Sequence, residues 1–121
     1  MANSFIEQRQ GSMQDFNKLM RSASQLIQSG DAQDLVEIYE EIELIMKEYP
    51  SLFPEDSFQG KTKASIDILE DRDSFNQIAK KTEELASLAK IASENNDMDA
   101  LQQHHQNLFS TCKSCHSRFK D

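Results

Sequence analysis

Helical periodicity constrains this chain more than any other feature of its sequence. Apolar residues recur at the three- and four-residue spacing of an amphipathic helix over residues 5–27, over residues 35–46 and over most of the chain after residue 73. Helix-breaking residues are few, because the chain contains only three glycines and two prolines. The pattern predicts an all-α fold.

Turn-forming residues divide this pattern. Gly30 suits the left-handed C-terminus of a first helix, and Asp31 can cap a second helix directly after it. The second helix is expected to end near Tyr49, because Pro50 disfavours helical geometry in the residue before it. A short turn therefore joins the first two helices, which should run antiparallel.

A longer connection separates the second helix from the third. About twenty residues follow the second helix that include both prolines and a glycine, which is longer than helical bundles normally use. The third helix is expected to begin at Asp71 or Asp73 and to end at the sequence ENND, where Asn96 or Asp97 caps the fourth helix. The long connection should cross one end of the molecule and hold a helical turn.

Four amphipathic helices in sequence predict an antiparallel up-down-up-down four-helix bundle with a long connection between helices two and three. The 121 residues are enough for one domain, residues 1–121, with a core of its own. The residues expected inside share apolar character and helical spacing: Phe16, Met20, Leu35, Tyr39, Ile42, Met46, Phe75, Ala79, Leu88, Ile91, Leu101 and Leu108. Such a core offers positions for a cofactor.

The last helix carries both cysteines of the chain. Cys112, Cys115 and His116 form the sequence CKSCH, in which the second cysteine lies about 60° to one side of the first and the histidine about 40° to the other. The three side chains therefore share one helical face and can bind one object. The remaining histidines, His104 and His105, are expected to form a surface pair.

Four kinds of site use two cysteines at this spacing: a redox pair, half of a zinc site, a structural disulfide and a covalently attached haem. A redox pair is expected at the start of a helix, and this pair lies near a helix C-terminus. Zinc would require ligands that no second CxxC or HxxxH supplies. A disulfide across one turn would gain little from restricting the unfolded chain. Haem attachment accounts for all three residues, because each thiol adds to a vinyl group and the imidazole binds the iron.

A CxxCH on the last helix of a four-helix bundle resembles the class II cytochromes c, the cytochrome c-prime family. The segment IEQRQGSM is similar to the N-terminal element of that family, and SENNDMDALQQHHQNLFSTCKSCHSRFK is similar to its final turn and helix. The resemblance covers most of the chain. It implies one haem c per chain, covalently held by Cys112 and Cys115, with His116 as the proximal iron ligand and Arg9 near a propionate.

The same resemblance assigns the distal iron position to Met13. High-spin members have a non-ligating apolar residue there, whereas members with methionine form a low-spin, six-coordinate branch of electron carriers. The start of the first helix lies beside the end of the fourth in an up-down-up-down bundle, which independently favours this residue. Met46, near the end of the second helix, is its rival.

The expected function is therefore electron transport by a haem protein, not an enzyme, with the iron bound by His116 and Met13. The alternative is a five-coordinate cytochrome c-prime that binds nitric oxide or carbon monoxide at an open distal face. A haem-free helical interaction module is a third class of function that the sequence leaves open.

Charge and hydropathy limit the partners. Asp and Glu outnumber Lys and Arg by 21 to 13, and the net charge of −8 disfavours nucleic acid and anionic membranes. The expected partners are redox proteins with a basic or neutral docking surface, and a homodimer is compatible with the resemblance. No apolar run is long enough to span a membrane. Covalent haem attachment takes place outside the bacterial cytoplasm, so the chain is expected to be periplasmic, with its leader removed.

Overall fold

The computed structural model describes residues 2–54 and 67–119, with the backbone alone described for residues 2, 3, 67, 69 and 116–119. Its helices are α1 (Ala2–Ser29), α2 (Leu35–Glu48), the 3-10 helix η1 (Tyr49–Leu52), α3 (Asp67–Glu70), α4 (Arg72–Glu94) and α5 (Met98–Phe119). Within these residues there is no strand. The prediction of an all-α four-helix bundle is confirmed, and α3 lies in the long connection, where a helical turn was expected.

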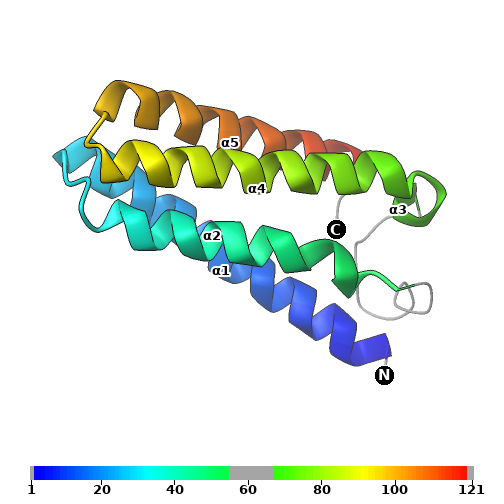
Figure 1. Cartoon of the computed structure of the whole chain (residues 1–121). Helices are drawn as coiled ribbons and strands as arrows, with labels where there is room; N and C mark the ends of the chain where they lie inside the picture. The colour runs from blue at the N-terminus through cyan, green and yellow to red at the C-terminus, as the bar shows by residue number, and fades with distance from the viewer. Residues whose placement is uncertain (1, 55–66, 120–121) are drawn as a thin grey trace.

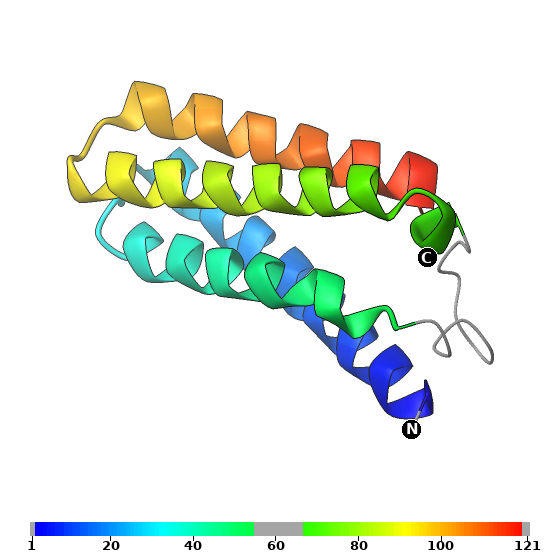
Figure 2. The ribbon, with the colours of Figure 1, turned by 45° about the vertical axis from the view of Figure 1, so that its right-hand side comes forward.

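The four long helices run alternately in opposite directions (Figure 1). Helix α4 packs against both α2 and α5 along most of its length, whereas α1 contacts α2 less and α5 over only a short stretch. Figures 1 and 2 both show α1 diverging from the α4 and α5 pair toward its own N-terminus. The N-terminal half of α1 and the C-terminal half of α5 therefore belong to the same end of the molecule.

Gly30 builds the turn between α1 and α2. Its φ angle is +77°, and its N–H donates a hydrogen bond of 3.1 Å to the carbonyl of Ile27. This is the left-handed helix end that the sequence predicted. The prediction that Asp31 caps the next helix is wrong, because α2 begins only at Leu35 and its N-cap residue is Asp34, whose side chain makes no capping hydrogen bond.

The other helix ends follow the sequence closely. Helix α2 ends at Glu48, as Pro50 predicted, but the chain continues into η1 with the proline in its first turn, where a missing N–H costs nothing. Asp71 is the N-cap residue of α4. Asp97 caps α5, since its Oδ1 accepts a hydrogen bond of 3.2 Å from the N–H of Ala100. Both caps were among the expected alternatives.

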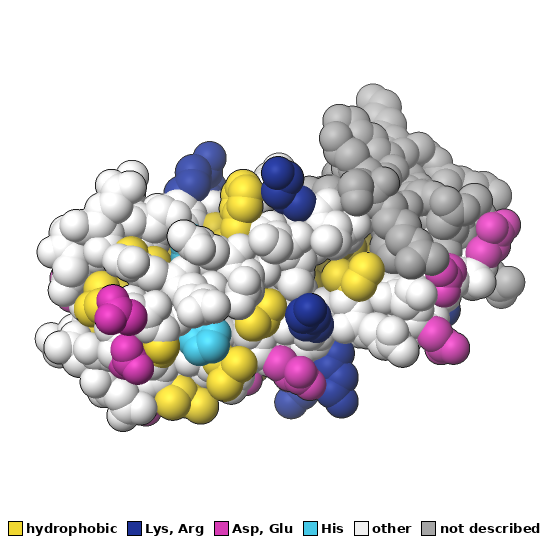
Figure 3. All heavy atoms as spheres, turned by 90° about the horizontal axis from the view of Figure 1, so that it is seen from above, with side chains coloured by type: hydrophobic (Ala, Val, Ile, Leu, Met, Phe, Trp, Pro, Cys, Tyr) yellow, Lys and Arg dark blue, Asp and Glu magenta, His cyan; other side chains and the backbone are white. Residues whose placement is uncertain are grey.

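A single hydrophobic core runs through the bundle. Its fully buried side chains include Phe16, Leu35, Tyr39, Ile42, Phe75, Leu101 and Leu108. The prediction that Leu88 and Ile91 are buried is wrong, because 45% and 50% of these residues are exposed. The apolar positions of α4 form a wider stripe than its two neighbours cover. Hydrophobic side chains accordingly reach the surface beside a histidine in Figure 3.

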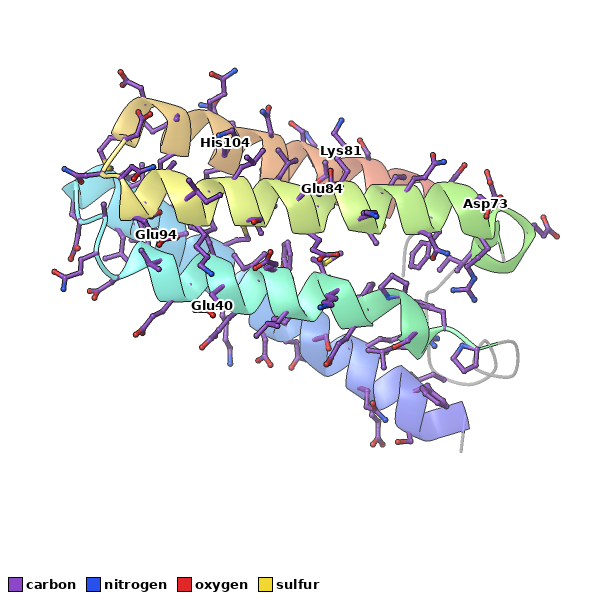
Figure 4. The ribbon with its side chains drawn as sticks, viewed as in Figure 1. Glu40, Asp73, Lys81, Glu84, Glu94 and His104 are labelled. Carbon is purple, nitrogen blue, oxygen red and sulfur yellow. The ribbon has the colours of Figure 1, made fainter. Side chains whose placement is uncertain are left out.

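His105, like His104, is half-buried rather than exposed, which corrects the prediction of a surface histidine pair. Its Nε2 lies 2.9 Å from Ser24 Oγ of α1, and its Nδ1 lies 2.9 Å from the hydroxyl of Tyr39 of α2. Burial lowers the pKa of His105 and raises that of Tyr39, so both are neutral near pH 7. His104, labelled in Figure 4, is half-buried along the edge where α5 meets α4. The partners of His105 lie on two other helices, so the sequence of α5 alone does not reveal them.

The two described glycines should respond to alanine with opposite signs. Gly30→Ala should lower the free energy of unfolding by about 1 kcal/mol, because an L side chain is strained at positive φ. Gly11→Ala, inside α1, should raise it by about 0.5 kcal/mol through helix propensity. An added methyl meets no heavy atom within 4 Å at either position, so packing does not obscure the comparison. Denaturant titration followed by circular dichroism measures both, and shifts of the same sign would contradict the Gly30 turn.

Candidate functional site

Cys112 and Cys115 lie one turn apart on α5, and both contact the hydrophobic core. They are free thiols. Burial raises the pKa of Cys112 to about 12 and that of Cys115 to about 11, and the proximity of Cys115 adds to the first shift. A redox pair requires the opposite, a cysteine with a lowered pKa. Two protonated thiols on one helical face, directed at an apolar core, fit covalent attachment of a flat apolar group such as haem.

His116 follows Cys115 directly in α5, and its backbone is helical. Its side chain lies outside the described residues, so its role as proximal ligand stays a prediction.

Two buried hydroxyls hold the cysteine-bearing turn of α5 against α4. Thr82 Oγ1 lies 3.0 Å from Thr111 Oγ1, and the Thr111 hydroxyl donates a hydrogen bond of 2.8 Å to the carbonyl of Leu108. Both threonines are buried, and buried hydroxyls require such partners. The sequence did not suggest this pair. Its only signal was a threonine at an inward position of each helix.

Met13 lies in the N-terminal half of α1. Its half-buried side chain packs against the same hydrophobic core that Cys112 and Cys115 contact. Met20 and Met46 are almost completely buried in that core, with 8% and 6% of each residue exposed. Met13 and both cysteines therefore contact the same core, from halves of α1 and α5 that belong to the same end of the molecule (Figure 1). Iron ligation by Met13, or by its rival Met46, stays a prediction.

Arg9, one helical turn before Met13, is completely buried. Its Nη1 donates a hydrogen bond of 3.2 Å to the carbonyl of Leu52, and its guanidinium carbon lies 4.6 Å from the centroid of the Phe53 ring. A buried cation needs partners of this kind. The structure thus gives Arg9 a contact with η1 that the sequence did not suggest, and contact with a propionate stays a prediction.

Arg72 holds the same segment from α4. Its Nη1 donates a hydrogen bond of 3.2 Å to the carbonyl of Pro50, and its Nη2 donates to the carbonyl of Phe53. The Phe53 ring makes edge contacts with Tyr49 and Phe75, at centroid distances of 5.1 and 5.0 Å. Cations suit this position because carbonyls at the end of a helix carry partial negative charge. The sequence did not suggest a role for Arg72, because no motif includes it.

In the haem-free chain, iodoacetamide should alkylate both cysteines at pH 8 at least about a hundredfold more slowly than free cysteine, and Cys112 more slowly than Cys115, because only the thiolate reacts. The raised pKa values also set a pH dependence. The ionised form of each thiol favours the unfolded chain. The stability that the buried, protonated thiols contribute is therefore complete below pH about 8.5 and is lost as the pH rises toward 11. Mass spectrometry of alkylated protein measures the rates. Equal rates with and without denaturant would contradict the burial.

Arg9→Gln should lower the free energy of unfolding by about 2 kcal/mol, because glutamine loses the charge-assisted hydrogen bond to Leu52 and the contact with Phe53. Arg21→Gln, on the exposed side of the same helix, should change it by less than about 0.5 kcal/mol. Denaturant titration of both variants makes the comparison. Equally small effects would mean that Arg9 is not held in the contact with η1.

Residues 4–120 match the family model described as Cytochrome C′. Among curated proteins, a cytochrome c′ of Rhodospirillum rubrum is 36% identical over 77 residues, which make up 63% of this chain and 52% of that protein. The match thus spans about half the length of this relative.

Solved structures share the fold over nearly the whole chain. Cytochrome c prime from Shewanella frigidimarina superposes with a TM-score of 0.91 at 20% identity, covering 100% of this chain and 97% of that chain. A cytochrome c′ described by its ligand-controlled dimer dissociation gives a TM-score of 0.89 at 16% identity, covering 98% and 95%. These likenesses establish the fold. Since the family model extends over almost every residue, from the start of α1 through the CKSCH sequence, the chain belongs to the cytochrome c′ family.

Proposed function

We propose that this chain holds one haem c through Cys112 and Cys115, with His116 as the proximal ligand, and binds nitric oxide or carbon monoxide on the opposite face. The observation that carries the proposal is the family match over residues 4–120. The cytochrome c′ family binds haem c, is typically five-coordinate and high-spin, and is known for binding gases. When bound, haem supplies the iron that takes up a diatomic gas.

In this function the chain would hold and orient the haem. Two thiols one turn apart would fix one edge of the macrocycle to α5. The hydroxyl pair of Thr82 and Thr111 keeps that turn against α4. Because α4 also packs along α2, the attachment turn would be a rigid reference for the rest of the site. His116, next in the helix, would present its imidazole from the same rigid element.

The opposite side of the site would belong to α1. Met13 is one of four residues of α1, with Leu19, Leu26 and Ile27, that contact the shared core with a partly buried side chain, and it is the nearest of them to the N-terminus. A thioether is flexible and can fill space or move aside. In the gas-binding function, Met13 would line the distal face and restrict its size without binding the iron. The short contact between α1 and α5 is compatible with a group inserted between them.

One observation favours a second candidate function, electron transfer. Met13 is half-buried and packs against the core that Cys112 and Cys115 also contact, so its thioether is a candidate second ligand for the iron. Two ligands fixed by packed helices would keep the reorganisation energy of electron transfer small. A thioether ligand raises the reduction potential of the iron relative to a second imidazole. The family match does not favour this low-spin branch over the typical five-coordinate state, and for that reason gas binding comes first.

Location and partners are part of the proposal. Members of the family are typically periplasmic, and we infer the same compartment for this chain. The family is not known for enzymatic activity. Across the described ranges, the helices lack a stretch of the length and apolarity needed to cross a membrane. Redox partners with a basic or neutral docking surface would suit the acidic chain. A homodimer is supported by the dimer named for one similar structure.

Optical spectra of the ferric, ferrous and carbonyl forms test the proposal. Gas binding predicts a high-spin ferric protein that forms a carbon monoxide adduct, with little change in Met13→Leu, because leucine conserves volume. Electron transfer predicts a low-spin protein that Met13→Leu converts to high spin. Met20→Leu, a buried methionine on the same helix, is the control and should leave the spectra unchanged in either case.

Three outcomes would contradict these expectations. A low-spin spectrum that persists in Met13→Leu would point to Met46 or another ligand. Haem that is extracted by acid-acetone would exclude attachment through Cys112 and Cys115. A purified protein without haem, from cells that attach haem to other cytochromes, would favour a helical interaction module.

A further inference from the structure

His105 joins three helices at one point, away from the cysteines. Its Nε2 lies 2.9 Å from Ser24 Oγ on α1, and its Nδ1 lies 2.9 Å from the hydroxyl of Tyr39 on α2. The rings of His105 and Tyr39 also make an edge contact, with centroids 6.1 Å apart. We call these three residues the His105 hub. The hub lies about 10 Å along α5 from Cys112, so it has no place in haem attachment.

Tyr39 determines which ring nitrogen carries the proton. This tyrosine is fully buried and keeps its hydroxyl proton, because burial raises its pKa. Within the part of the chain that the structure describes, its hydrogen-bond partner is Nδ1 of His105, which must therefore accept. The proton of the neutral ring is then on Nε2, which donates to Ser24 Oγ. Each leg of the hub thus satisfies one nitrogen of a half-buried ring.

The two hydrogen bonds of the hub lead to helices that differ in how extensively they pack against the rest of the bundle. Helix α2 packs against α4 along most of its length, so its place in the bundle does not depend on Tyr39. Helix α1 contacts α5 over only a short stretch and diverges from it toward the N-terminus (Figures 1 and 2). The hydrogen bond from His105 to Ser24 joins α1 to α5 directly at the end where they are close. Loss of this hydrogen bond should therefore change the position of α1 more than that of any other helix.

We infer that the His105 hub is a positioning device that sets the place of α1 relative to α5, and with it the distance of Met13 from the face that carries the cysteines. Ser24 and Met13 belong to one continuous helix, about 16 Å apart along its axis. A small rotation of α1 about the hub therefore displaces Met13. This deepens the proposed function and rests on it in one respect, namely that Met13 borders the gas-binding face. His105 acts through α1 and touches no reacting atom.

A matched pair of variants separates the two legs. Ser24→Ala and Tyr39→Phe each remove one hydroxyl and one hydrogen bond to the same ring, but the first removes a bond to α1 and the second a bond to α2. Ser24→Ala should raise amide hydrogen exchange in α1, and the association rate of carbon monoxide with the reduced haem-loaded protein, by about fivefold, which corresponds to about 1 kcal/mol. Tyr39→Phe should leave both within about twofold of the parent protein. Ser24→Thr keeps the hydroxyl and should restore both values.

The hydrogen-exchange measurement tests the hub, and the carbon monoxide measurement also tests the proposed function, so the two can be contradicted separately. If α1 exchange rises equally in Ser24→Ala and Tyr39→Phe, or if Ser24→Ala lowers the unfolding midpoint alone, the hub is merely structural and the inference is overturned. A parent protein that binds no carbon monoxide would contradict the proposed function, while the comparison of exchange rates would still test the hub. Alanine is a favourable helix residue, so Ser24→Ala should retain the fold.

Discussion

The packing of α4 between α2 and α5 is the constraint on which the rest of the structure depends. These three helices bury most of the core together, including Tyr39, Phe75 and Leu108. The same packing holds the cysteine-bearing turn of α5, because Thr82 on α4 bonds to Thr111 directly before Cys112. One side of the site is thereby fixed to the most rigid part of the molecule. The remaining long helix, α1, packs less extensively against these three helices.

Polar contacts attach α1 at points near its two ends. Arg9 is buried against the carbonyl of Leu52 and the ring of Phe53, and Ser24 bonds to His105. Buried polar groups are costly unless their partners are placed accurately, so they specify a position more sharply than apolar packing does. Met13 lies between the two attachments. Its place is thus set by contacts that lie outside the haem-binding sequence itself.

The sequence predicted features that depend on a single residue or on a local pattern. Gly30 ends α1 because of its own backbone freedom, and Pro50 ends α2 because of its own ring. The sequence was less informative where a residue's position depends on neighbouring helices. Asp31 is a good capping residue, but α2 begins only at Leu35, beyond its reach. Ile91 has core-like spacing and is half-exposed, because α2 and α5 cover a narrower stripe of α4 than its apolar pattern suggests.

The candidate site also combines features that a local pattern predicts with features that depend on neighbouring helices. The CKSCH sequence and its place near the end of a helix indicate haem, because the two thiols and the imidazole share one helical face and a redox pair would be expected at a helix start. The role of Met13 cannot be read from its residue type, since a thioether ligates iron or fills space depending on about an ångström of position. That position belongs to α1, and α1 is placed by Arg9 and by the His105 hub. Whether this chain binds gas or only transfers electrons would then depend in part on His105 and Ser24, which lie away from the cysteines.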